Sequence, residues 1–233
     1  MKSKILIIII LNLSLVFCTP EIYKESIGNF VEIRSKEGKI KRFPPNVKWI
    51  GFENTFTPDV WDLSLFPQLI SLEITSPNFK NLDDLPDLPN LEYLNLRGTG
   101  IKKIKSLSKF PKLATLILSE TKITDWNELA NLKKLSRLRL DKTEVETIIF
   151  AEDLVELRHL DLRHTKVVSL SPLKKSKKLI DLQIGHTNIS DLSPLYELKD
   201  LFYLEFDNTP VTKEASEELR KKLPYVKLVT RLR

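Results

Sequence analysis

The chain has 233 residues, of which 42% are hydrophobic, and it contains 6 glycines and 13 prolines. This length suits one domain or one repeat array, and the composition excludes a linker or a disordered tail. The net charge of +6 comes from 37 basic and 31 acidic residues that are interspersed along the chain. Because nucleic-acid binding needs a clustered basic surface, we expect no nucleic-acid partner. Cys18 is the single cysteine, which excludes an intramolecular disulfide.

Residues 1–18 have the pattern of an export signal. A basic start with Lys2 and Lys4 precedes the apolar run of residues 5–17. A helix of that length spans roughly 20 Å, which is less than the ~30 Å apolar core of a bilayer. We therefore expect a signal peptide over residues 1–18 rather than a transmembrane anchor.

The end of this leader resembles the lipobox of bacterial lipoproteins, in which a Leu lies three residues before a Cys that becomes the lipidated N-terminus. Leu15 and Cys18 match that motif, whereas Phe17 stands where the family has a small residue. The resemblance implies a lipid anchor at Cys18, and this anchor is the one membrane contact that we expect. Export with cleavage near Cys18 and without lipid is the alternative.

Residues 19–46 are expected to cap the N-terminal end of a repeat array. Two short β-like runs, residues 30–33 and 39–43, flank Lys36-Glu37-Gly38, which is a hairpin signal. Pro44 and Pro45 then mark the entry into the array. Repeat stacks need such caps because their terminal units would otherwise expose the apolar core.

Residues 47–211 repeat one pattern every 22 residues, and a ninth unit follows at the C-terminal end. Each unit opens with LxxLxL or a close variant, and its eleventh and seventeenth positions are apolar as well. One unit cannot bury these side chains alone, so the units stack and bury them against one another. The units begin at Val47, Leu69, Leu91, Leu113, Leu135, Leu157, Leu179, Leu201 and Leu223.

The opening of each unit is predicted to be a strand. Its fourth and sixth residues face the core, and its third, fifth and seventh residues face solvent. Strands of successive units lie parallel, about 4.8 Å apart. The return segments are too short for long helices, and Ser171-Pro172 and Ser193-Pro194 indicate short 3₁₀ turns.

Threonine occupies the ninth position of seven units. A buried turn leaves backbone groups that need partners, and a stacked column of hydroxyls is expected to supply them. Pro77 interrupts the column, so we expect an irregularity in the second unit. The segment around Phe150 departs most from the repeat and is expected to bulge outward. The threonines are Thr55, Thr99, Thr121, Thr143, Thr165, Thr187 and Thr209.

Residues 212–233 are expected to close the other end with one helix and a last strand. Thr212 suits an N-cap, Glu214 lies in the first turn, and Arg220, Lys221 and Lys222 lie in the last turn. Pro224 ends the helix, and residues 225–230 supply the strand.

Residues 47–230 resemble the bacterial leucine-rich repeat proteins of the 22-residue class, to which internalins belong. The run from Ile189 to Leu195, ISDLSPL, is especially similar to that class. The resemblance implies an α/β fold: a right-handed leucine-rich repeat solenoid with a parallel β-sheet on its concave face and short 3₁₀ turns on its convex face. The helical N-terminal cap of internalins is not visible in residues 19–46.

The concave face carries the residue types that are enriched in protein-binding hot spots, namely Tyr, Trp and Arg. Ile117 is apolar where solvent is expected. The alternative is that the arginines only form lateral pairs across strands, Arg139 with Asp161 and Arg163 with Asp141. The predicted ligand-binding residues are Tyr93, Arg97, Ile117, Arg137, Arg139, Arg163 and Tyr203.

Neither a metal site nor a catalytic site is expected. His164 and His186 occupy one column of neighbouring units and are the weak candidates for holding a metal, although polar surface histidines explain them as well. No glycine-rich phosphate loop or nucleophile elbow is present, so we expect no enzyme activity and no cofactor.

These observations predict a monomeric, non-enzymatic protein-protein interaction module of the bacterial cell envelope. We expect it to bind a protein or host-surface ligand through its concave face. Its expected location is the outer membrane or cell surface as a lipoprotein, or the periplasm or the exterior as a free protein. The alternative is a structural or assembly role within the envelope without an external ligand.

Overall fold

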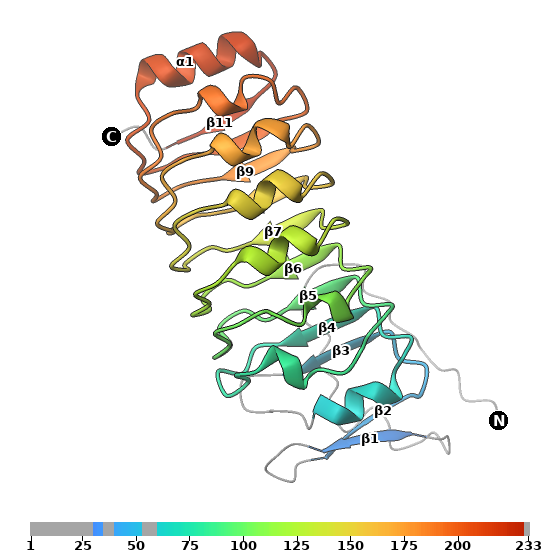
Figure 1. Ribbon diagram of the computed structural model, residues 1–233. Helices are drawn as coiled ribbons and strands as arrows, with labels where there is room; N and C mark the ends of the chain where they lie inside the picture. Colours follow the sequence, from blue (N-terminus) through green and yellow to red (C-terminus); the bar gives the residue numbers. More distant parts are fainter. Residues whose placement is uncertain (1–29, 35–39, 53–59, 231–233) are drawn as a thin grey trace, which may run out of the picture.

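The computed structural model of the protein describes residues 30–34, 40–52 and 60–230, in which one sheet runs the length of a stacked array (Figure 1). The predicted signal peptide with Cys18, and Thr55, lie outside the described residues. Within the described ranges, none of the helices has the length and apolar character needed to span a bilayer.

Nine parallel strands form the main sheet in sequence order, as the 22-residue repeat predicts. From β3 to β10, residues one repeat apart lie opposite each other, for example Leu116 beside Leu138. The strands are β3 (Trp49–Phe52), β4 (Ser71–Ile74), β5 (Tyr93–Asn95), β6 (Thr115–Ile117), β7 (Arg137–Arg139), β8 (His159–Asp161), β9 (Asp181–Gln183), β10 (Tyr203–Glu205) and β11 (Lys227–Val229).

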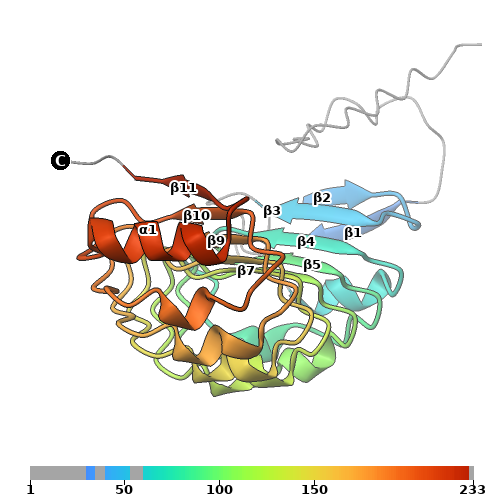
Figure 2. The same ribbon diagram turned by 90° about the horizontal axis from the view of Figure 1, so that it is seen from above.

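Short 3₁₀ helices occupy the side of the array opposite the sheet (Figure 2). The alternation of parallel strands with such turns confirms the predicted leucine-rich repeat solenoid. We call the solvent-facing side of the sheet, formed by the third, fifth and seventh positions of each unit, the concave face. The 3₁₀ helices are η2 (Val60–Leu65), η3 (Leu82–Asp84), η4 (Leu107–Lys109), η5 (Asn127–Asn131), η6 (Ile149–Asp153), η7 (Ser171–Lys175) and η8 (Ser193–Leu195).

The core is a continuous apolar column between the sheet and the 3₁₀ turns. The fourth-position side chains of β3 to β10 are at most 1% exposed, and sixth-position residues such as Leu96 and Leu118 are fully buried. Apolar residues at the eleventh and seventeenth positions complete the column, and all belong to one cluster. Burial of this repeated set is the main stabilising contribution to the fold.

An antiparallel hairpin of β1 (Val31–Arg34) and β2 (Ile40–Phe43) lies at the N-terminal end of the array. Phe43 is 4% exposed and packs edge to face on Phe52 and Phe66, with ring centroids 6.3 and 6.1 Å apart. The side chain of Phe43 therefore covers the end of the core.

Helix α1 (Lys213–Lys222) and strand β11 form the C-terminal end. The Thr212 hydroxyl caps the helix by accepting a hydrogen bond from the Ala215 amide at 3.1 Å. The predicted frame is wrong in the last unit: Tyr203 pairs with Lys227, 24 residues on, rather than with Tyr225. A full α-helix replaces the 3₁₀ turn here, and the return path is two residues longer.

The threonine hydroxyls bond within their own unit rather than from turn to turn. Each described ninth-position Thr donates to the carbonyl oxygen three residues before it, at 2.6–2.8 Å. Buried backbone acceptors are thereby satisfied, as expected. The irregularity expected at Pro77 is also present: the turn falls on residues 77–78, two residues later than in the following units.

The predicted outward bulge around Phe150 is wrong. Residues Ile149–Asp153 form η6 in register with the neighbouring turns, and Phe150 is only 4% exposed. Ala151 stands at the seventeenth position, where other units have Leu, and the neighbouring Phe150 ring turns inward. The segment therefore stays within the apolar column, where Phe150 and Ala151 are both buried.

Ser176 is a polar exception inside the core. It occupies the twentieth position, which is Phe66, Leu88, Phe110, Leu132, Leu154 and Leu198 in other units. It is 2% exposed, and among the described residues its hydroxyl oxygen has no hydrogen-bond partner. A buried hydroxyl without a partner keeps its full desolvation cost.

The eighth position adopts a left-handed backbone in six consecutive units. Gly98 has a φ of +67°, and five non-glycine residues have φ values of 55° to 61°. L-residues are strained in this region, whereas glycine is not and asparagine only mildly so. The five are Glu120, Lys142, His164, His186 and Asn208.

Replacing Gly98 with alanine is expected to destabilise the fold by about 1 kcal/mol through the backbone alone. No atom lies within 4 Å of the Cβ that alanine would add, so a steric clash does not contribute. Gly98→Asn should cost less, because asparagine tolerates the left-handed region. Urea unfolding of the three proteins measures the order, and equal midpoints for Gly98→Ala and the wild type would contradict it.

Two eighth-position side chains, His164 and His186, stack with centroids 4.1 Å apart and planes at 14°. The Asn208 amide nitrogen lies 3.1 Å from Nδ1 of His186. Burial and the electrostatic influence of His186, Lys142 and Arg163 lower the pKa of His164, and Asp141 opposes them. The folded protein therefore favours the neutral form of His164.

Because the folded pKa of His164 is depressed, its contribution to stability is complete above the unfolded pKa of about 6.5. That contribution is lost as the pH falls below this value, since the unfolded state then binds more protons. We expect the melting temperature of the wild type to fall between pH 8 and pH 5 relative to that of His164→Asn. The difference should be small, because both rings are exposed. The same dependence of melting temperature on pH in both proteins would contradict the lowered pKa of His164.

Candidate functional site

The concave face presents two columns of side chains, from the third and the fifth strand positions. The parallel register places each side chain about 4.8 Å from its equivalent in the next unit. The third position reads Tyr93, Thr115, Arg137, His159, Asp181 and Tyr203 from β5 to β10. The fifth reads Asn95, Ile117, Arg139, Asp161, Gln183 and Glu205.

A charge network centred on Asp161 occupies the middle of the face. The Arg163 guanidinium donates to both oxygens of this carboxylate, at 2.9 and 2.7 Å, and the Arg163 backbone amide donates to one of them at 3.2 Å. Nε of Arg139 lies 3.4 Å from Asp161 on the other side. Asp161 is only 4% exposed, so its charge depends on these partners. The same carboxylate raises the pKa of Arg163.

Asp141 is the second buried carboxylate of this network, at 5% exposure. It accepts a hydrogen bond from the Ser119 hydroxyl and one from Arg139 at 3.3 Å. Lateral pairs between arginines and carboxylates of adjacent units were the alternative to a ligand-binding role. Such a pair is present between Arg139 and Asp161. Arg163, by contrast, pairs with Asp161 of its own unit instead of Asp141.

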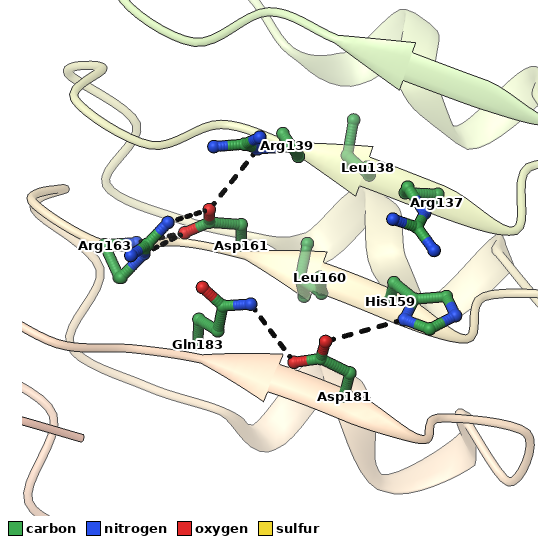
Figure 3. A pocket seen from close by; sticks show the side chains of 9 residues that line it. All are labelled: Arg137, Leu138, Arg139, His159, Leu160, Asp161, Arg163, Asp181 and Gln183. Carbon is green, nitrogen blue, oxygen red and sulfur yellow. Dashed lines mark hydrogen bonds and ion pairs between the residues drawn. The ribbon is translucent and has the colours of Figure 1, made fainter. Parts of the chain in front are cut away.

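A polar hollow of about 130 Å³ opens between β7 and β9, beside this network (Figure 3). His159 Nδ1 lies 3.6 Å from a carboxylate oxygen of Asp181, and the Gln183 amide donates to the other oxygen at 3.3 Å. Arg137 lies on the same wall as His159, and its side chain is exposed. Across the part of the chain that the structure describes, the guanidinium of Arg137 makes no hydrogen bond or ion pair, although its backbone amide donates to the Ala114 carbonyl oxygen at 2.9 Å.

Four of the seven predicted binding residues come together at this place. Arg137, Arg139 and Arg163 line the hollow, and Ile117 lies beside Arg139 on the next strand. Tyr93 lies one strand further on and is half-buried. Burial and the nearby charge of Glu73 raise the pKa of the Tyr93 hydroxyl.

Arg97 and Tyr203 lie apart from the hollow. Arg97 forms an ion pair with Glu120 at 3.0 Å at the turn edge of the sheet, and Lys142 contacts the same carboxylate. Tyr203 lies towards the C-terminal end, where the amino group of Lys227 is 5.9 Å from its ring centroid. Neither residue lines the hollow.

The predicted set missed four polar residues that line the hollow, namely His159, Asp161, Asp181 and Gln183. The sequence contained the signal, because His159 and Asp181 follow Arg137 in the third-position column. A selection by residue type alone passes over them, since neither His nor Asp is a typical hot-spot residue.

The histidines do not form a metal centre in the described ranges, where no three His, Cys, Asp or Glu side chains are placed to share an ion. His164 and His186 are stacked face to face on the turn edge. His159 lies instead on the concave face beside Asp181. A metal ligand needs its nitrogen lone pair aimed at one point, and parallel stacked rings aim theirs along separate planes.

Comparison with protein families matches residues 89–131 to the family described as Leucine Rich repeats (2 copies). Comparison with curated proteins gives no match. Among solved structures, internalin C2 of Listeria monocytogenes superposes with a TM-score of 0.73 at 25% identity, covering 79% of this chain and 81% of that one. A second internalin of that species, InlF, superposes with a TM-score of 0.64 at 22% identity. The match covers 77% of this chain and 59% of the length of InlF.

A more distant match is the leucine-rich repeat ectodomain of the Arabidopsis thaliana membrane receptor kinase GASSHO1/SCHENGEN3, solved in complex with Casparian strip integrity factor 2. Its TM-score is 0.60 at 18% identity, with 77% of this chain and 24% of that chain covered. This likeness shows the fold alone. From its repeat sequence, its sheet and these matches, the chain folds as a leucine-rich repeat solenoid that is structurally similar to Listeria internalins.

Proposed function

We propose that the protein is a non-enzymatic binding module whose concave face recognises a protein or host-surface ligand. The observation that carries the proposal is the polar hollow lined by exposed Arg137, with the apolar side chain of Ile117 opposite Arg139 on the neighbouring strand. Internalin-like leucine-rich repeat folds are typical of protein-binding modules and are usually non-enzymatic. The plant receptor ectodomain, solved in complex with its factor, is one case of such a fold that holds a protein ligand.

The concave face is suited to binding because it is organised before a ligand arrives. Hydrogen bonds between nine strands hold its backbone, and the buried pairs of Asp141 and Asp161 hold Arg139 and Arg163 in place. A surface that loses little conformational freedom on association keeps more of its contact energy as affinity. Both signs of charge occur in the two columns, which favours a protein partner over nucleic acid.

Ile117→Asp is expected to abolish or strongly weaken capture of a ligand from bacterial envelope extracts or host-cell surface extracts. The substitution introduces a charge that must be desolvated at the centre of the face. Ile149→Asp is the matched control, because Ile149 is 63% exposed on η6, on the opposite side. Quantitative affinity capture with the three proteins measures the effect. Arg139→Glu is unsuitable, since it would set a third carboxylate beside buried Asp141 and Asp161.

Equal recovery of a ligand by wild type and Ile117→Asp would refute the concave face as the binding surface. Loss of binding by both variants would indicate a defect of folding rather than of recognition. Their melting temperatures therefore belong to the same experiment.

We propose further that the protein is exported and anchored to the cell envelope by lipid at Cys18. The basic and apolar order of residues 1–18 and the Leu15–Cys18 spacing support this. The alternative is an assembly role inside the envelope. Protease treatment of intact cells separates the two, because a protein that binds an external ligand must be accessible from outside.

Intact-mass measurement of the protein from its native membrane tests the anchor. We expect the chain to begin at Cys18 with covalently attached acyl chains and to leave the membrane fraction after Cys18→Ser. A mature mass without lipid, or a chain that still carries residues 1–17, would contradict the proposal.

A further inference from the structure

We infer that the hollow between β7 and β9 receives an acidic side chain of the protein ligand, held by Arg137, with an apolar ligand residue beside it on Ile117. The inference rests on the proposed function, because it names the chemistry that the concave face would recognise. Its basis is the way in which charges are matched inside the hollow.

Every carboxylate that lines the hollow already has partners within the protein. Asp161 accepts three hydrogen bonds from Arg163 and lies 3.4 Å from Arg139. Asp181 has His159 on one oxygen and the Gln183 amide on the other. These contacts hold the two carboxylates in place and occupy part of their capacity to accept hydrogen bonds.

Arg137 differs from the other arginines of the hollow. Over the described residues its guanidinium has neither a hydrogen bond nor an ion pair, whereas Arg139 and Arg163 are tied to buried carboxylates. The guanidinium offers five donors in a planar fork that matches a carboxylate in bidentate fashion. The free cation of the hollow is therefore suited to an anion that the ligand brings.

The surroundings of Arg137 favour a ligand in which an apolar residue lies beside the acidic one. On the N-terminal side, the neighbouring side chains of the two columns are Thr115 and Ile117, which carry no charge. Beyond them, Glu73 is occupied by the Asn95 amide at 2.8 Å. No carboxylate on that side competes for Arg137, and Ile117 gives an apolar contact within reach of the same ligand segment. The volume of about 130 Å³ accommodates a side chain rather than a folded element.

The test uses random dodecapeptides displayed on phage and selected on the full chain. The tightest binders are then synthesised with acetylated and amidated ends, so that side chains are their only carboxylates. We expect replacement of one Asp or Glu by its amide to weaken binding about tenfold or more, as for loss of a charge-assisted hydrogen bond. The same replacement in the peptide should not change its affinity for the Arg137→Gln variant, because the peptide change and the protein change remove the same interaction.

Arg158→Gln is the matched control, since Arg158 is exposed on the adjoining segment but does not line the hollow. It should bind every peptide as the wild type does. Arg137→Lys should recover only part of the affinity, because an ammonium keeps the charge but lacks the planar fork. Unchanged melting temperatures of these variants exclude a folding defect as the cause.

Some peptides could bind the wild type but not Ile117→Asp, and yet lose the same affinity for the wild type and for Arg137→Gln when their acidic residue becomes an amide. That result would overturn the inference and leave the proposed function standing. Selected peptides that are indifferent to both Ile117→Asp and Arg137→Gln would place binding elsewhere and overturn the concave face itself.

Discussion

The packing of each fourth-position leucine against its equivalents in the adjoining units is the interaction on which the molecule depends. Leu94, Leu116 and Leu138 lie opposite one another in the ladder and are fully buried. A single 22-residue unit has no other apolar surface on which to cover these side chains, so it is stable only between neighbours. The spacing is constant from β3 to β10, where a slip of one residue in a strand would turn its core side chains to the other face. The concave face inherits its order from this requirement.

The same register that stacks leucines also stacks charges, and this shapes the polar face. Residues of opposite sign in adjacent units are brought to about 4.8 Å before any side chain rotates. Arg139 beside Asp161 is a pair of this kind, and the same register sets the His159 imidazole beside the Asp181 carboxylate. Since Asp141 and Asp161 are almost completely buried, their partners are held by the cost of leaving a buried charge alone. Most of the ionic groups near the hollow are thus structural, and Arg137 is the exception.

The period of the sequence was enough to predict the sheet, its strand order and the register of eight strands, because a repeated spacing determines which residues become neighbours. It could not predict the register of β11, where a ten-residue α-helix replaces a 3₁₀ turn and lengthens the path. Phe150 shows a second limit: its ring is buried at the sixteenth position although the segment departs from the repeat, which a position-by-position comparison does not detect. In the candidate site, the sequence identified Arg137 and Arg139 but could not separate them. That distinction depends on which carboxylate each side chain reaches in three dimensions.

Ser176 has a consequence for how the array comes apart. In a repeat array, each unit is stabilised by contacts with its neighbours, and these contacts make neighbouring units unfold together. A weak interface between two units therefore allows the array to unfold in separate blocks. The sixth unit has a small hydroxyl side chain where the others carry a large apolar one, so its junctions with the adjoining coils are the poorest in apolar contact at that column. The C-terminal coils can therefore detach as a block while the first five remain stacked. Amide protons beyond Ser176 would then exchange with solvent as one group, at a lower free energy than those of the coils that carry the hollow's Arg137.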